Sequence, residues 1–253
     1  MLSMLQFLLV FLAAIAGGIV NALAGGGTLI TFPVLTAVGL PAVAANMTNT
    51  VALCPGYLGG TLAQRRDLVG QERRLWRLLP AGIVGGLLGA WLLQVSPEHL
   101  FRFLVPYLIL IGTVLLALQP RIKAWLDRRA ERRGSSAGET WSLPTIGLAT
   151  VYGGYFGAGL GVITLAVLGL TVTESLTRLN AVKQAISFAT NVAAAVFFIF
   201  SGLVVWPAAV VMFLGSLLGG SLGGRLAGRV KPGLLRQIVV GIGLVVAVIY
   251  FVV

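Results

Sequence analysis

Long runs of apolar residues recur along the whole chain, separated by short segments that carry most of the polar side chains. Runs such as 103–118 and 234–253 approach or exceed the roughly 20 residues that a helix needs to cross a hydrocarbon core. The apolar positions inside these runs do not alternate, which excludes the strands of a transmembrane barrel. The pattern therefore predicts an all-α, polytopic helical membrane protein.

The predicted elements comprise full-length spans and shorter apolar pieces. Full spans are expected at about 4–23, 45–63, 78–95, 101–118, 142–158, 181–200, 206–225 and 234–253, and shorter pieces at about 27–40 and 160–171. The segments between them are interpreted as loops, and the most basic are 64–77, 121–133 and 225–236.

Each shorter piece follows a glycine-rich stretch that weakens a helix in mid-membrane. The first stretch reads 21-NALAGGGTLITFP-33, and the second reads 157-GAGLGVIT-164. Irregular backbone inside a membrane persists only where it is buried in protein or lines a cavity. We therefore expect each segment to be a broken or re-entrant helix pair that turns back instead of crossing.

The two halves of the chain resemble each other. The matching pairs, all separated by roughly 133–136 residues, are 17–35 with 153–168, Asn46 with Asn180, Pro97 with Pro232, Gly85 with Gly220 and Gly89 with Gly224. Internal repeats of this kind are typical of transporters. We predict a first transmembrane repeat at 1–133, a cytoplasmic linker at 134–140 and a second repeat at 141–253, together forming a single membrane domain.

Charge predicts that the repeats are inserted in opposite orientations. Loop 64–77 is strongly basic, whereas its counterpart between spans at 201–206 is uncharged. Basic loops face the cytoplasm, so equivalent loops are expected on opposite sides of the membrane. Two inverted-topology repeats, each opening with a hairpin that returns to its starting side, place both chain termini outside and the linker inside.

Composition agrees with this interpretation. The chain has 58% hydrophobic and 10% charged residues, and its net charge of +11 is explained by cytoplasmic basic loops without invoking nucleic acid. One histidine, one cysteine and seven acidic residues provide no hydrolytic or metal-binding constellation, so we expect neither an enzyme nor a cofactor. The predicted partners are the lipid bilayer and a small substrate, and the predicted location is the plasma (inner) membrane, multi-pass.

The breaks suggest an anion site. A helix N-terminus presents N–H donors and a partial positive charge, and glycine lets the backbone approach a ligand closely. From the first break we expect Asn21, Gly25, Gly26, Gly27 and Thr28 to contribute. From the second break the mirrored candidates are Gly157, Gly159 and Gly161.

Polar residues at the starts of two later spans form a second layer of candidates. Asn46, Thr48 and Asn49 are expected to line the site, although Asn46 alternatively caps its helix. Lys183 is either an attractor for anions or a snorkelling residue. Glycines at small-xxx-small spacing are interpreted as helix-packing positions. They are Gly82/Gly86, Gly85/Gly89, Gly215/Gly219/Gly223 and Gly220/Gly224/Gly228.

The segment 17-GGIVNALAGGGTLITFPVLTAVGLPAVAANMTNTVA-52 resembles the TauE/SafE family of membrane transporters, often described as sulfite exporters. The resemblance rests on the N-A-x-A-G-G-G-T-L-x-x-F-P-x-L run, the following A-x-x-A-N-x-T-N-T and the degenerate second copy at 157–164, and it covers nearly the whole chain. It implies two related halves that move sulfite or organosulfur anions such as sulfonates.

These observations together predict a transporter that exports small oxyanions, with sulfite or organosulfonates favoured, by alternating access around a central site. One charge crossing ~100 mV is worth ~2.3 kcal/mol, so a negative cell interior drives a divalent anion outward by ~4.6 kcal/mol without ion coupling. A passive anion channel and a cation-coupled anion importer remain as alternatives. The sequence does not predict an oligomeric state.

Overall fold

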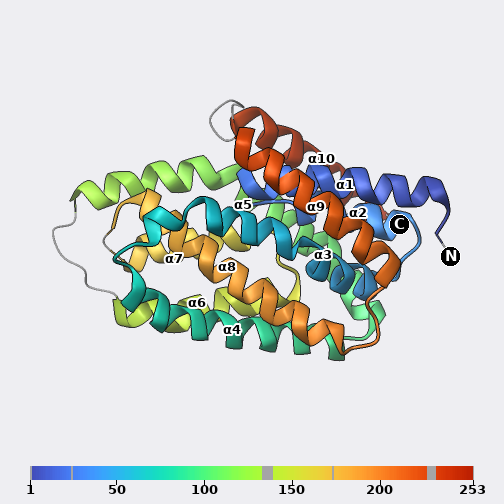
Figure 1. Cartoon of the computed structure of the whole chain (residues 1–253), viewed down its shortest axis with the longest axis horizontal. Helices are drawn as coiled ribbons and strands as arrows, with labels where there is room; N and C mark the ends of the chain where they lie inside the picture. Colours follow the sequence, from blue (N-terminus) through green and yellow to red (C-terminus); the bar gives the residue numbers. More distant parts are fainter. Residues whose placement is uncertain (1, 24, 133–138, 173, 227–231, 253) are drawn as a thin grey trace.

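The computed structural model describes residues 2–23, 25–132, 139–172, 174–226 and 232–252, and every regular element among them is helical. Figure 1 shows an elongated bundle whose long helices run roughly along one axis. The elements are α1 (Met4–Leu23), α2 (Thr28–Ala37), α3 (Ala42–Ala63), the 3₁₀ turn η1 (Arg65–Leu68), α4 (Glu72–Val95), α5 (Glu98–Arg132), α6 (Glu139–Tyr155), α7 (Leu160–Thr171), α8 (Leu176–Ile199), α9 (Trp206–Leu226) and α10 (Pro232–Val252).

Five of the described helices are long and apolar enough to cross a membrane. They are α1, α4, α5, α8 and α9, while α2, α7 and the described part of α10 are shorter apolar helices. The prediction of a polytopic helical membrane protein is therefore confirmed. The predicted spans at 45–63 and 142–158 are also helices, α3 and α6, but both carry more polar residues and fall outside these five.

The bundle has two ends with different characters. At one end, here called the terminal end, Gln6 Nε2 donates to the Val38 carbonyl at 3.2 Å, and Thr36 contacts Tyr250 through their hydroxyls. The beginning of α1 and the end of α10 therefore lie at the same end as the α2–α3 turn. Figure 1 shows both chain termini there.

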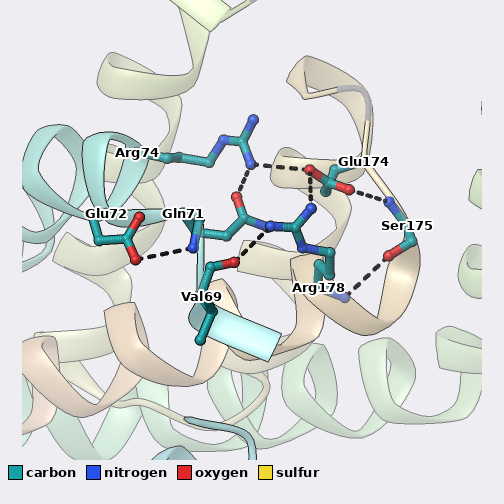
Figure 2. A network of polar contacts seen from close by, with 8 residues as sticks. Val69, Gln71, Glu72, Arg74, Glu174, Ser175 and Arg178 are labelled. Carbon is teal, nitrogen blue, oxygen red and sulfur yellow. Dashed lines mark hydrogen bonds and ion pairs between the residues drawn. The ribbon is translucent and has the colours of Figure 1, made fainter. Parts of the chain in front are cut away.

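The opposite end, here called the basic end, carries η1 with Arg65 and Arg66. It also carries the turn between α7 and α8, because Arg178 donates to the Val69 carbonyl at 2.8 Å. Figure 2 shows the polar network at this end, in which Glu174 faces both Arg74 and Arg178.

The two short helices turn back toward opposite ends. Helix α1 starts at the terminal end, and α2 returns to it, as the contact between Gln6 and Val38 demonstrates. Helix α6 lies alongside α4 in the same direction, because Gly85 faces Gly147 and Gly89 faces Val151. Helix α6 therefore starts at the basic end, and α7 returns there to join α8.

Each break is formed by the same backbone device. Gly25 and Gly157 have φ values of +79° and +81°, in the left-handed region that favours glycine. Each donates its amide to a carbonyl five residues earlier, Val20 at 3.0 Å and Tyr152 at 3.3 Å. These bonds end α1 and α6 and redirect the chain, so the prediction of a break at both glycine-rich stretches is confirmed.

Glycine packing holds the hairpins against long helices from the other part of the chain. A Cβ on Gly219 would meet the Ile15 carbonyl of α1, and one on Gly89 would meet the Val151 carbonyl of α6. Helix α9 therefore covers α1, and α4 covers α6. The packing prediction is confirmed for Gly89 and Gly219, whose helices approach one another backbone to backbone, whereas Gly228 lies outside the described residues.

One predicted pairing needs correction. Gly85 faces the first helix of a hairpin, α6, whereas Gly220 faces Gly56 of α3. By these contacts Gly219, which faces α1, resembles Gly85 more closely than Gly220 does. The same reasoning pairs Gly86 with Gly220, because Gly86 faces Thr190 of α8 in the way that Gly220 faces Gly56 of α3.

Two predicted loops are partly helical. The basic segment 121–133 continues α5 as far as Arg132, because Leu126 is buried against Gly169 of α7 and packing extends the helix. The basic segment 64–77 contains η1 and the first residues of α4, which begins at Glu72. Arg229 and Lys231 of the third basic loop lie outside the described residues.

Candidate functional site

Both breaks lie against the same part of α5, near the middle of its apolar length. A Cβ on Gly26 would lie 3.0 Å from Leu116 Cδ2, and one on Gly159 would lie 3.3 Å from the Gly112 Cα. Gly112 and Leu116 are one helical turn apart, about 6 Å along the axis. The fold therefore brings two helix breaks, far apart in the sequence, to nearly the same depth.

Aromatic packing fixes this meeting point. Phe156, in the second break, makes an edge-on contact with Phe32 of α2, with ring centroids 5.4 Å apart. Phe101 of α5 contacts both rings at 6.3 Å, and Phe32, Phe101 and Phe156 are all buried. Contacts of this kind restrict ring orientation and so hold the two hairpins in register.

At the first break, α2 begins at Thr28 as predicted, directly after Gly25, Gly26 and Gly27. Asn49 of α3 closes this helix start, because Thr31 Oγ1 donates to Asn49 Oδ1 at 2.5 Å and Asn49 Nδ2 donates to Thr28 Oγ1 at 3.5 Å. Thr28 and Asn49 are thus brought together as expected. Their side chains, however, are engaged with each other and with Thr31.

Asn21 lies in the last turn of α1 beside the break. Its Cβ is close to Gly27, its Nδ2 is close to Gly56 of α3, and its side chain interacts with the Tyr57 hydroxyl. The residue is 5% exposed, and Nδ2 has no hydrogen-bond acceptor among the described residues. A buried donor of this kind is costly unless a ligand or water satisfies it.

At the second break, Gly159 has a φ of +80° and α7 begins at Leu160. Gly161 is therefore the second residue of α7, inside the short piece expected at 160–171. The Ala158 carbonyl accepts a bond from the Tyr152 hydroxyl at 2.7 Å. No described residue accepts a hydrogen bond from the amides of Ala158, Gly159 or Gly161.

Asn46 connects α3 to the second break. Its Nδ2 donates to the carbonyl of Tyr155, the last residue of α6, at 2.8 Å. Its Oδ1 is buried with no donor among the described residues. Helix α3 begins at Ala42, so the alternative that Asn46 caps this helix is wrong. Thr48 is engaged elsewhere, accepting from the Val205 amide in the α8–α9 turn at 3.0 Å.

Lys183 lies in α8 with its side chain against Gly161. It is 8% exposed, and Nζ donates to Asn180 Oδ1 at 2.9 Å. Asn180 in turn donates to Gln64 Oε1 of α3 at 2.6 Å. No ion pair joins Lys183 to a carboxylate in the described part of the chain. The ammonium is therefore held inside the bundle by neutral partners.

Further polar contacts follow the crossing of α3 and α8. Cys54 Sγ lies 3.5 Å from Asn191 Oδ1, and Thr61 Oγ1 donates to the Gln184 carbonyl at 3.3 Å. Gly60 leaves room for the Gln184 side chain, since a Cβ there would collide with it. Polar groups are thus present along this crossing from the breaks to the basic end.

Sequence reasoning missed several hydroxyl groups near the breaks. Thr31, Thr164 and Ser187 are completely buried, and the hydroxyls of Thr164 and Ser187 have no partner among the described residues. One signal was available, because Thr31 and Thr164 occupy equivalent places after the two glycine-rich stretches. Among the described residues, no three His, Cys, Asp or Glu side chains cluster in a way that could hold a metal ion.

The profile of the sulfite exporter TauE/SafE family matches residues 10–250. The chain belongs to the TauE/SafE family. TauE/SafE proteins are membrane transporters, so the predicted family and the transmembrane transporter class are confirmed. A multi-pass membrane protein that carries a small substrate is the function that this membership supports.

Curated relatives agree with that membership. The chain is 28% identical over 210 residues to a probable membrane transporter protein of Haemophilus influenzae, an alignment that covers 83% of this chain and 80% of the relative. It is 28% identical to the probable membrane transporter protein ORF9 of Sinorhizobium sp, covering 82% and 78%. It is 26% identical to the probable membrane transporter protein YfcA of Escherichia coli K12, covering 86% and 79%. No solved structure matches the chain.

Proposed function

We propose that this TauE/SafE protein exports small oxyanions, sulfite or organosulfonates, across the plasma (inner) membrane by alternating access. The observation that supports this most directly is the meeting of both helix breaks against Gly112 and Leu116 of α5. The starts of α2 and α7 are helix N-termini, which carry partial positive charge and suit an anion.

The electrostatic character of the region favours an anionic passenger. Lys183 contributes a buried amino group, and Asn21 contributes a buried side-chain amide. The acidic residues whose side chains are described, Asp67, Glu72, Glu98 and Glu174, are all at or near helix ends. In a low-dielectric interior this balance attracts negative charge and repels cations.

Alternating access draws support from the way the helices pack. The packing of α1 on α9 is equivalent to the packing of α6 on α4. In the same way, the packing of α3 on α9 is equivalent to the packing of α8 on α4. Hairpins that enter from opposite ends are the arrangement expected of inverted repeats, in which one half moves against the other around a fixed site. The repeat boundaries at 1–133 and 141–253 and their inverted insertion belong to this proposal.

The membrane potential sets the direction. One charge across ~100 mV is worth ~2.3 kcal/mol, so a negative interior expels anions without a coupled cation. A cation-coupled importer would instead require a cation site, for which carboxylates are the usual ligands. Export is therefore the direction that this set of residues favours.

The test uses purified full-length protein in proteoliposomes loaded with sulfite or methanesulfonate. We expect saturable efflux that is accelerated by exchange with external substrate. Gly26→Leu should reduce efflux at least tenfold, because the side chain would be forced against Leu116. Gly59→Leu is the matched control, since a Cβ there meets nothing within 4 Å, and its efflux should resemble that of the wild type.

The outcomes separate the alternatives. Uphill uptake driven by a proton or sodium gradient would replace export with cation-coupled import. Single-channel currents without exchange acceleration would identify a passive channel. Full efflux by Gly26→Leu, with unchanged thermal stability, would remove the first break from the transport path.

A further inference from the structure

Equivalent positions at the two breaks are used differently. We propose that the substrate's anionic group binds in the second half only, at the start of α7, between Lys183, Thr164 and Ser187. The first break is then a closed structural copy of this site. The inference rests on the proposed transport function and adds which half holds the charge and which hydroxyls select it.

The equivalence comes from sequence spacing and contacts. Thr31 and Thr164 are separated by 133 residues, and Asn49 and Lys183 are separated by 134. Asn49 contacts the first turn of α2 through Thr28 and Thr31. Lys183 contacts the first turn of α7 at Gly161. In each half, the helix that follows the short helix, α3 or α8, therefore contacts the first turn of that short helix.

In the first half this place is chemically satisfied. The Thr31 hydroxyl faces both Asn49 Oδ1, at 2.5 Å, and the Gly27 carbonyl, at 3.1 Å. Asn49 Nδ2 has an acceptor in Thr28 Oγ1. The side chains of Thr28, Thr31 and Asn49 therefore complete one another, and none of these three needs a ligand.

In the second half the polar groups around the start of α7 are less completely paired. The hydroxyls of Thr164 and Ser187 are fully buried and unpaired among the described residues. Nζ of Lys183 makes its bond to Asn180 and retains two further N–H groups, since an ammonium has three donors. The amides of Ala158, Gly159 and Gly161 add backbone donors without acceptors in the described chain.

The helical register directs these donors toward one region. Gly161 and Thr164 are three residues apart and so share a face of α7, the face against which Lys183 lies. Helices α7 and α8 run in opposite directions, so Ser187, one turn beyond Lys183, lies level with the break. The unpaired groups therefore border the start of α7 on its α8 side.

The chemistry of this region specifies the ligand. Every group of the set offers hydrogens, and a bound anion would stabilise the charged form of Lys183, which no described carboxylate balances. A compact anion with several acceptor oxygens, such as hydrogen sulfite or a sulfonate group, matches this donor set. A substrate without a negative charge would leave the ammonium uncompensated.

The experiment compares Thr164→Val with its structural counterpart Thr31→Val. Binding of radiolabelled sulfite to the purified full-length protein gives Kd, and thermal unfolding gives stability. Loss of one hydrogen bond to a charged ligand weakens binding by about tenfold or more, so Thr164→Val should raise Kd by that factor. Thr31→Val should leave Kd within about twofold while lowering Tm, because its bonds are internal.

Further variants keep the test decisive. Thr164→Ser retains the hydroxyl and should bind as the wild type does, and Ser187→Ala should weaken binding even if Thr164→Val fails to fold. Lys183→Gln should weaken binding more than either hydroxyl variant, with partial rescue by Lys183→Arg. Equal Kd values for Thr164→Val and Thr31→Val, in a wild type that transports sulfite, would overturn this inference alone. A wild type that neither binds nor transports sulfite or methanesulfonate would overturn the proposed function as well.

Discussion

At the scale of single residues, the glycines fall into groups according to what surrounds them. Gly219 of α9 and Gly241 of α10 are both helical, but their neighbours differ completely. A Cβ on Gly219 would press into the Ile15 carbonyl, whereas one on Gly241 meets nothing within 4 Å. The same substitution therefore has opposite effects at the two positions.

We predict that Gly219→Ala destabilises the protein and that Gly241→Ala does not. Overpacking against backbone costs about 1–3 kcal/mol. Replacing an exposed helical glycine by alanine instead gains up to about 1 kcal/mol. Thermal unfolding in detergent, followed by tryptophan fluorescence, measures both. Equal shifts in Tm would contradict the view that α9 and α1 are in backbone contact.

Sequence reasoning located some site residues better than others. It placed Gly25 to Gly27 and Thr28 at a break because adjacent glycines have no role in an uninterrupted span. It missed Thr164 and Ser187, because a threonine or serine in a membrane helix usually bonds to its own backbone, as Thr190 does to Ile186. Whether such a hydroxyl stays unpaired depends on tertiary packing, which spacing does not reveal.

At the scale of elements, the start of α3 depends on a side chain from another helix. Helix α3 follows Pro41, whose side chain provides no cap. The Glu98 carboxylate, at the start of α5, accepts bonds from the Ala42 amide at 2.5 Å and the Val43 amide at 3.1 Å. This contact satisfies the first donors of α3 and joins the α2–α3 and α4–α5 turns.

We predict that Glu98→Ala lowers the free energy of unfolding by about 0.5–2 kcal/mol, the usual cost of losing a helix cap. Glu98→Gln should lose less, because the amide oxygen still accepts a bond. Chemical or thermal unfolding in detergent distinguishes the two variants. A stability of Glu98→Ala equal to that of the wild type would show that water replaces the carboxylate at no cost.

Helix boundaries were predictable where composition changed and were wrong where packing decided them. The glycine-rich stretches revealed α2 and α7, because closely spaced glycines lower helix propensity and do not have the spacing of helix packing. The extension of α5 to Arg132 was not evident, because its basic residues resemble a cytoplasmic loop. Only the burial of Leu126 against Gly169 accounts for a helix there.

At the scale of the whole molecule, the network in Figure 2 joins distant parts of the chain at the basic end. Glu174, in the α7–α8 turn, is 3.8 Å from Arg74 of α4 and 3.3 Å from Arg178 of α8. The Arg178 guanidinium also reaches the Val69 carbonyl. If the halves move apart during transport, the contacts of Glu174 with Arg74 and of Arg178 with Val69 must break.

We predict that Glu174→Gln opens the basic end more often. Partly exposed ion pairs contribute about 0.2–1 kcal/mol, which corresponds to an increase of about 1.5- to 5-fold in the open population. Cys54, the single cysteine, lies at the α3–α8 crossing and provides the probe. Its reaction with a maleimide applied from the basic side should accelerate by that factor.

Glu72→Gln is the matched control for this prediction. Glu72 accepts a bond from the Gly70 amide at 2.9 Å within its own loop, and although the charge of Arg178 acts on it, it forms no ion pair with the second half among the described residues. Its variant should label at the wild-type rate. Identical labelling rates for Glu174→Gln and the wild type would mean that the network does not restrain opening.

The packing of each opening hairpin against a helix from the other half of the chain has a consequence for biosynthesis. Helix α1 rests on α9, whose first residue, Trp206, follows the end of α1 by more than 180 positions. A ribosome must therefore complete most of the polypeptide before the opening hairpin acquires its permanent neighbour. Until then the small-residue surface of α1 contacts lipid or the insertion machinery. Two separately translated fragments, divided near residue 135, should accordingly assemble only when they are produced together.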